Sequence, residues 1–279
     1  MVQIHSPLLF FFSLPATSGL LNSLDVPQTV NRQTNRFWEI DVLRGVAIIM
    51  MIIYHLLFDL TFFGIYPIDL WSLPLQLFLY PIGTMFLLLV GISLTISYSR
   101  ASERLTAWQL RKKFILRGLF IFTGGMVITL ATYLYLHQGY VVFGVLHCIG
   151  LSIILAYPLI ELRFSALFLG SVCIAAGVYL QALVTVDFPW LLWLGFIPRN
   201  FFTVDYFPLL PWIGVILIGI FLGQSLYQGH TRKFRFPDYS EKKTVRGMSF
   251  LGRHSLLIYF IHQPILLALL ALLTGAHIF

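Results

Sequence analysis

Long apolar stretches separated by short polar segments dominate the sequence from residue 36 onward. A membrane-spanning helix needs about 20 consecutive apolar residues, because the hydrocarbon core of a bilayer is about 30 Å thick. Seven stretches meet that length, at residues 40–63, 73–98, 114–136, 141–160, 164–186, 206–226 and 249–273. The apolar segment 190–197 is too short to span, and its two Trp residues favour a place at the membrane surface. The pattern therefore predicts an all-α, polytopic membrane helix bundle with about seven spanning helices.

The first 35 residues differ from the rest of the chain. Their apolar run Leu8–Leu14 is too short to span a membrane, and it lacks the basic segment that precedes a signal peptide's apolar core. Residues 15–35 are rich in Ser, Thr, Asn and Gln. We expect residues 1–35 to form a disordered or interfacial extension, and residues 36–279 to form a single transmembrane domain.

Composition supports a membrane protein and excludes most other classes. Hydrophobic residues make up 58% of the chain and charged residues only 10%, whereas a soluble domain is about one quarter charged. The mean hydropathy of +0.87 also excludes a disordered chain. The localisation we expect is that of a multi-pass protein of the plasma (cytoplasmic) membrane.

The net charge of +7 could indicate a nucleic-acid partner, but the placement of the basic residues argues against one. All Lys and Arg residues except Arg199 fall before the first predicted span, on alternate loops, or near the ends of spans that adjoin those loops. Cytoplasmic loops carry such an excess of Lys and Arg. The charge therefore predicts a topology with the N-terminus inside and the C-terminus outside, and no nucleic-acid surface.

Cysteine and histidine spacing gives no sign of a metal site. Cys148 and Cys173 lie inside apolar runs, so they indicate neither a disulfide framework nor a zinc site. The histidines considered as metal ligands are His55, His147 and His262, but no two of these three share a predicted helix and no HExxH motif is present. We expect no bound metal.

The first predicted span carries the richest set of ionisable residues, which are costly at membrane depth and so indicate function. Arg44 and His55 are 11 residues apart, which places them on one stripe of a helix, about 16 Å apart along its axis. His55 and Asp59 are an i,i+4 pair, so the carboxylate could touch the imidazole and fix its tautomer. Arg44 as a snorkelling anchor and His55 as a hydrogen-bonding residue between helices are the structural alternatives.

Two further candidates lie near the outer ends of other spans. His147 is six residues into the fourth stretch, between two glycines of the segment Phe-Gly-Val-Leu-His-Cys-Ile-Gly. Asp205 stands at the start of the sixth, where it suits a helix N-cap as well as a catalytic acid.

The seventh stretch adds polar residues near its start and in its middle. Tyr259 and His262 share a helical face by their i,i+3 spacing, and Gln263 follows directly. Arg253 and His254 lie near its cytoplasmic end, where anchoring explains them as well as function does.

These motifs together resemble those of a known family of membrane enzymes. The Arg-x10-His spacing of the first span is similar to the motif of the transmembrane acyltransferase superfamily. Within it, the chain resembles the heparan-alpha-glucosaminide N-acetyltransferase catalytic-domain family, in its small prokaryotic branch. The segments that carry the resemblance are Ile-Asp-Val-Leu-Arg-Gly-Val-Ala at 40–47, Phe-Gly-Val-Leu-His at 143–147, Asp-Tyr-Phe-Pro-Leu-Leu-Pro-Trp at 205–212 and Leu-Gly-Arg-His-Ser-Leu-Leu-Ile-Tyr-Phe-Ile-His-Gln-Pro at 251–264.

The resemblance implies an enzyme that moves an acetyl group from acetyl-CoA to an amine or hydroxyl of a glycan or small-molecule acceptor, across the membrane. Family members are thought to use a histidine in the loop after the first helix, but loop 64–72 here has none, so the role passes to His55 through the Arg-x10-His spacing. His55 would act as general base or carry the acetyl group, Asp59 would orient it, and Arg44 would stabilise the reacting thioester.

The remaining candidates divide between the two substrates. The cytoplasmic cations would bind the phosphates of CoA: Arg44, Arg117, Arg253 and His254. The outer polar residues would line the acceptor side: His147, Asp205, Tyr259, His262 and Gln263. The alternatives are a small-solute transporter or channel without acyl transfer and a structural membrane subunit, and a homo-oligomer is compatible with the sequence.

Overall fold

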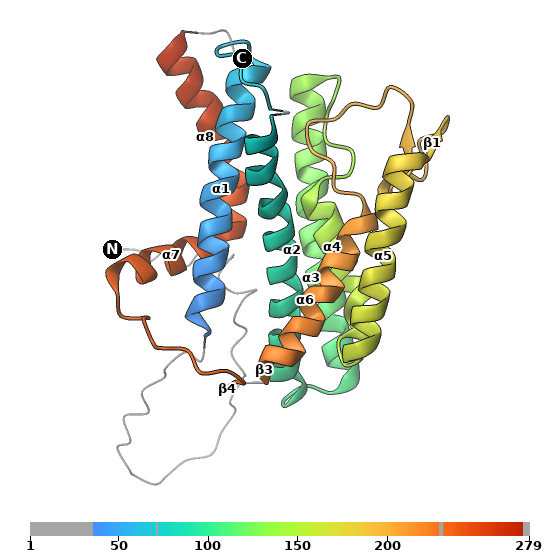
Figure 1. Ribbon diagram of the computed structural model, residues 1–279, viewed down its shortest axis with the longest axis vertical. Coiled ribbons are helices and arrows are strands. Elements are labelled where there is room, and N and C mark those ends of the chain that lie inside the picture. The colour runs from blue at the N-terminus through green and yellow to red at the C-terminus, as the bar shows by residue number, and fades with distance from the viewer. Residues whose placement is uncertain (1–35, 71, 229–230, 276–279) are drawn as a thin grey trace. The chain divides into compact units, whose positions relative to one another are not determined.

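A computed structural model describes residues 36–70, 72–228 and 231–275, and most of them are helical (Figure 1). The α-helices of this part of the chain are α1 (Trp38–Phe62), α2 (Leu73–Ser102), α3 (Ala107–Leu136), α4 (Val145–Ala156), α5 (Arg163–Leu183), α6 (Leu209–Leu226), α7 (Lys243–Arg253) and α8 (Ser255–Thr274). Among them, α1, α2, α3, α5, α6 and α8 are long and apolar enough to cross a membrane. The predicted polytopic helical bundle is thereby confirmed, while the extension 1–35 lies outside the described residues.

The connections contain only short regular elements. Two 3-10 turns occur, η2 (Tyr157–Leu159) and η3 (Leu192–Leu194). Strands β1 (Thr185–Val186) and β2 (Ile197–Pro198) form a parallel pair, and β3 (Tyr227–Gln228) and β4 (Thr231–Arg232) form an antiparallel pair. The segment 190–197, expected at the membrane surface, contributes η3 and the first residue of β2.

Two of the predicted spans differ from the observed helices. The fourth stretch, 141–160, contains only the 12 residues of α4 followed by η2, because the chain up to Gly144 is extended and Pro158 tightens the end into a 3-10 turn. The seventh stretch, 249–273, is divided at His254 into the end of α7 and the whole of α8. The basic, amphipathic α7 crosses α1 instead of continuing the apolar α8 (Figure 1).

Local signals explain several of the helix ends. The Thr106 hydroxyl accepts the Gln109 backbone N–H at 3.4 Å, while the Gln109 side chain accepts the Thr106 N–H at 3.0 Å, which makes a capping box for α3. Pro74 stands in the first turn of α2, where a missing N–H costs nothing. Gly275, in the left-handed conformation, ends α8.

The main core lies between α2, α3, α4 and α6. Its fully buried side chains include Leu87, Phe114, Ile153 and Ile216. Small residues let α2 and α6 approach closely, since a Cβ on Gly91 would lie 2.1 Å from the Ile216 carbonyl oxygen.

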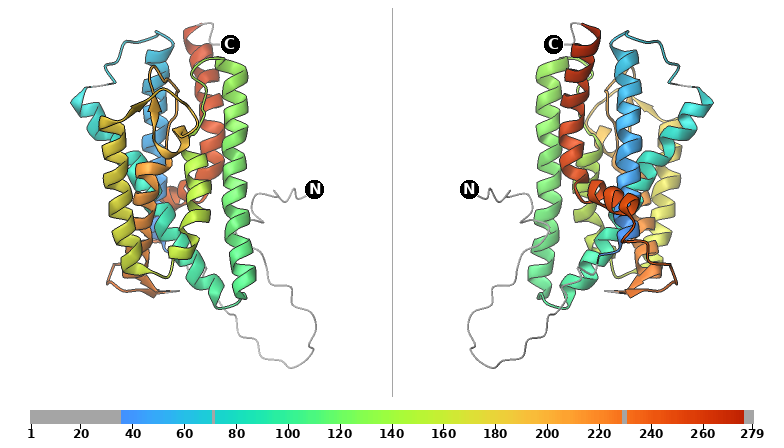
Figure 2. Two further views of the ribbon diagram at one scale, coloured as in Figure 1. Left: turned by 90° about the vertical axis from the view of Figure 1, so that its right-hand side faces the viewer. Right: turned by 90° about the vertical axis from the view of Figure 1, so that its left-hand side faces the viewer.

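A second group of helices, α1, α7 and α8, supplies most of the ionisable candidates. Helix α7 packs mainly against α1, and α8 runs beside both α1 and α3 (Figure 2). The start of α1, the α2–α3 and α4–α5 connections, and strands β3 and β4 lie at one end of the bundle (Figure 1). Basic residues lie in or beside each of these segments, among them Arg36, Arg104, Arg163 and Arg232.

Candidate functional site

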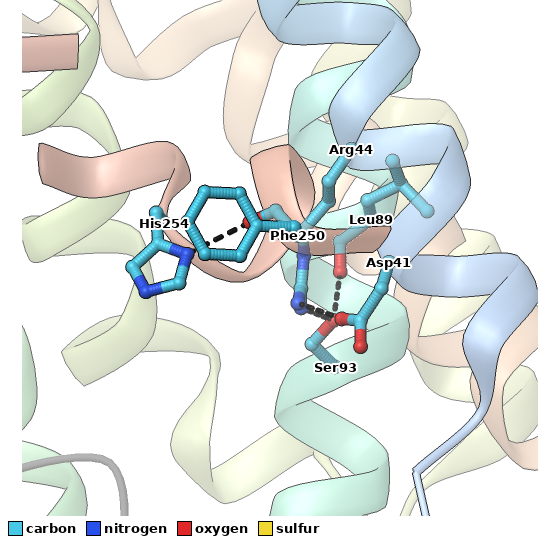
Figure 3. A network of polar contacts seen from close by, with 6 residues as sticks. All are labelled: Asp41, Arg44, Leu89, Ser93, Phe250 and His254. Carbon is cyan, nitrogen blue, oxygen red and sulfur yellow. Dashed lines mark hydrogen bonds and ion pairs between the residues drawn. The ribbon is translucent and has the colours of Figure 1, made fainter. Parts of the chain in front are cut away.

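A polar network surrounds Arg44 in the first half of α1 (Figure 3). One guanidinium nitrogen lies 3.3 Å from Asp41 Oδ1, one turn earlier in the same helix. The other donates to the Ser93 hydroxyl on α2, which donates in turn to the Leu89 carbonyl oxygen. Arg44 thus links α1 to α2 and is held in one orientation.

Two other predicted cations lie within electrostatic range of this network. Arg117 on α3 is close enough to Arg44 for the two positive charges to repel each other. Arg253, the last residue of α7, is exposed, and its charge acts on the Asp41 carboxylate. The structure therefore brings together three of the four cations that we predicted for CoA binding, with Asp41 as the acid between two of them.

The fourth predicted group, His254, makes local contacts instead. Its Nδ1 lies 2.8 Å from the Phe250 carbonyl oxygen, and its ring is tilted by 42° against the Phe250 ring, with centroids 4.3 Å apart (Figure 3). Within the described part of the chain, no hydrogen bond or ion pair joins His254 to Arg44. These contacts stabilise the junction of α7 and α8.

Farther along α1, its polar residues meet α8. The rings of His55 and His262 are in edge-to-face contact, with centroids 4.8 Å apart. The Tyr259 ring lies 5.6 Å from that of His262, and the Tyr259 carbonyl oxygen is 2.7 Å from His262 Nδ1. Three predicted residues from opposite ends of the sequence therefore form one cluster.

Asp59 does not make its predicted contact. Its carboxylate accepts from the Gln263 side-chain amide, at 2.7 Å to Oδ1 and 2.9 Å to Oδ2. No hydrogen bond joins Asp59 to His55 among the residues described. The i,i+4 spacing made that contact geometrically available, but the packing of α8 against α1 brings the Gln263 amide to the carboxylate instead. Asp59 is almost fully buried, with 1% of its surface exposed.

His147 and Asp205 both bind the first turn of α4. His147 Nδ1 accepts the Gly144 N–H at 3.2 Å, and its Nε2 lies 3.4 Å from the Thr129 hydroxyl. Asp205 Oδ2 accepts the Val145 N–H at 3.2 Å. Asp205 therefore caps α4 and not α6, at whose N-terminus the sequence had placed it.

The Asp205 carboxylate is also close to the histidine cluster. Its charge acts on the hydroxyls of Tyr54 on α1 and Tyr259 on α8. Burial raises the pKa of the Asp205 carboxyl to about 6, and the hydrogen bond from the Val145 N–H opposes that rise. Asp205 therefore lies within electrostatic range of Tyr54 and Tyr259, whose rings contact His55 and His262.

Sequence reasoning overlooked Ser93, the partner of Arg44. A hydroxyl inside the apolar stretch 73–98 is a polar group at membrane depth, and this was the available signal. Ser residues are common in such helices because they can bond to a carbonyl one turn back, as Ser93 does. Within the described ranges, no three His, Cys, Asp or Glu residues gather closely enough to hold a metal ion.

One comparison with known proteins gives a match. The sequence model of a family described as "Heparan-alpha-glucosaminide N-acetyltransferase, catalytic" matches residues 36–264. This range includes every candidate residue named above. No curated protein and no solved structure matches the chain.

Proposed function

Because the chain belongs to the heparan-alpha-glucosaminide N-acetyltransferase catalytic family, we propose that it moves an acetyl group from acetyl-CoA to an amine or hydroxyl of a sugar-type acceptor. The family and the six apolar helices identify a multi-pass membrane protein of a transferase family. We propose acetyl-CoA as the donor, a sugar-type molecule as the acceptor, and transfer from the cytoplasmic side toward the outer side.

The observation that carries the proposal is the closeness of Arg44 and Arg117. The two positive charges act on each other within a bundle of apolar helices, and the Asp41 carboxylate lies beside Arg44. A polyanion placed between them would relieve the repulsion, and guanidinium groups bind phosphate through paired hydrogen bonds. The phosphates of CoA have this chemistry, and Arg253 at the end of α7 adds a third positive charge.

The distance from these cations to the histidines suits a long, thin donor. Along α1, Arg44 and His55 are about 16 Å apart. The pantetheine arm of CoA is an extended chain that carries its thioester far from its phosphates. With the phosphates at Arg44 and Arg117, the thioester would reach His55, which acts as general base or acetyl carrier. The acceptor would approach from the opposite end, past Tyr259, Gln263, His147 and Asp205.

The membrane orientation that we predict from the basic residues supports this arrangement. The end of the bundle that carries them would face the cytoplasm, where acetyl-CoA is present. The histidine cluster lies toward the other end, so transfer would cross part of the plasma membrane. In this orientation acetyl-CoA would enter from the cytoplasmic side and the acceptor from the opposite side.

Binding and transfer can be tested separately with the purified protein in detergent. Acetyl-CoA should raise the melting temperature, since a ligand of the folded state stabilises it by mass action. Labelled acetyl-CoA mixed with an alkyl α-glucosaminide should give an acetylated sugar, and His55→Ala should abolish the product. No thermal shift at saturating acetyl-CoA, or solute flux through proteoliposomes without any dependence on acetyl-CoA, would contradict the proposal. Unimpaired transfer by His55→Ala would remove His55 from the mechanism.

A further inference from the structure

His262 is held in one tautomer by its own helix. Its Nδ1 lies 2.7 Å from the Tyr259 carbonyl oxygen. A carbonyl oxygen can only accept a hydrogen bond, so Nδ1 carries the proton and donates it. In a neutral imidazole this leaves the lone pair on Nε2.

Within the described residues, no group donates a hydrogen bond to that lone pair. His262 is buried, with 7% of its surface exposed, and its Nε2 has no hydrogen-bond partner among the described residues. Buried polar atoms in native proteins are nearly always bonded, and exceptions often mark a functional site. The Nε2 atom can therefore accept a hydrogen bond or a proton from a bound substrate.

The neighbouring residue presents a second open acceptor. The Gln263 amide nitrogen is committed to the Asp59 carboxylate, so its carbonyl oxygen, Oε1, is turned away from Asp59. This oxygen is also buried without a partner in the described part of the chain. Consecutive residues of α8 thus each carry a buried hydrogen-bond acceptor without a donor in the described part of the chain.

In the part of the chain that the structure describes, His55 has no hydrogen bond of this kind to fix its tautomer. Its ring contacts the rings of Tyr54 and His262, but no hydrogen bond in the described residues selects one of its two tautomers. A general base works best when its lone pair is already oriented toward the proton that it takes. Of the two histidines, only His262 meets that requirement.

We infer that His262, in place of His55, is the general base of the transfer. This assignment rests on the proposed function and leaves to His55 only the role of acetyl carrier. The acceptor's nitrogen or oxygen bonds to the acetyl carbonyl carbon. The bond from that carbon to the leaving group breaks, and its electron pair stays with the CoA sulfur, or with a His55 nitrogen if His55 carries the acetyl group. The acceptor's proton moves to His262 Nε2 and from there to the leaving group, while Gln263 Oε1 accepts a hydrogen bond from the acceptor.

Two substitutions distinguish the role of His262 as a base from its structural hydrogen bond to the Tyr259 carbonyl oxygen. His262→Asn can still donate to the Tyr259 carbonyl oxygen but has no atom in place of Nε2. His262→Gln places an amide near Nε2 that cannot take a proton. His137→Asn is the control, because His137 is exposed at the end of α3 and Asn tolerates its positive φ of 59°. Steady-state transfer from acetyl-CoA to an alkyl α-glucosaminide gives kcat and the KM for acetyl-CoA, and melting temperatures with and without acetyl-CoA report folding and donor binding.

We expect both His262 variants to lose about 100-fold or more in kcat, with the KM for acetyl-CoA and its thermal shift unchanged, and the control to match the wild type. Transfer by His262→Asn near the wild-type rate would overturn the assignment. Parallel loss of kcat and of the acetyl-CoA shift in both variants would also overturn it, because His262 would then be structural. A wild-type protein that neither binds acetyl-CoA nor transfers its acetyl group would refute the proposed function itself, and that result is visible before any variant is made.

Discussion

The crossing of α1 and α7 is the contact most sensitive to a single added methyl group. A Cβ on Gly252 of α7 would lie 1.8 Å from the Asp41 carbonyl oxygen and 3.0 Å from the Gly45 backbone nitrogen. Ordinary contact begins at 3.4 Å, so Gly252→Ala requires α7 and α1 to separate by 1.6 Å, the difference between 3.4 and 1.8 Å. Both groups are backbone, so no flexible side chain can move aside.

Overpacking of this kind costs about 1–3 kcal/mol or more. We therefore expect Gly252→Ala to melt about 2–10 °C below the wild type in detergent. Because α1 also carries Arg44, a shift of α7 should weaken the acetyl-CoA thermal shift too. The assay is intrinsic tryptophan fluorescence during a temperature ramp, with and without acetyl-CoA.

Gly247→Ala provides a matched control on the same helix. A Cβ at Gly247 would meet nothing within 4 Å. Alanine is favoured over glycine inside a helix by about 0.5–1 kcal/mol, so this variant should be at least as stable as the wild type. If Gly252→Ala melts no lower than Gly247→Ala, the close approach of α1 and α7 is refuted.

Three more substitutions test other parts of the site. Arg44→Gln should lose the acetyl-CoA thermal shift, whereas Arg199→Gln, which breaks only an exposed ion pair, should keep it; an equal shift in both would contradict the phosphate site. Gln263→Leu leaves the buried Asp59 carboxylate without its donor and should cost about 1–3 kcal/mol in detergent unfolding, so an unchanged melting temperature would show that Asp59 has another partner. The pKa of Asp205, about 6, lies above its ordinary value, so the stability it adds is fully present below about pH 4 and disappears as the pH rises through about 6. From about pH 7 to pH 5 the wild type should therefore gain about 1 kcal/mol relative to Asp205→Asn, and parallel pH profiles of the two melting temperatures would exclude this role.

Two side-chain pairings show where prediction from the sequence stops. The spacing of His55 and Asp59 was consistent with a contact, because residues four apart lie on one face of a helix. Spacing does not rank competing partners, and Gln263, 204 positions away in the sequence, takes the Asp59 carboxylate. Arg44 and Arg117 were separate candidates for one ligand, and only the packing of the helices brings their charges within range.

The sequence by itself located the six long apolar helices, although it predicted seven spans, and it placed most basic residues between or beside them. Both follow from local quantities: the length of each apolar stretch and the identity of the residues between stretches. The tertiary structure decided that α4 is short, that the last predicted span divides at His254, and that His55 lies against His262. These outcomes depend on how closely helices approach and which face each presents, and contacts such as that of Gly252 with Asp41 set both. No single segment contains that information, since each contact joins residues far apart in the chain.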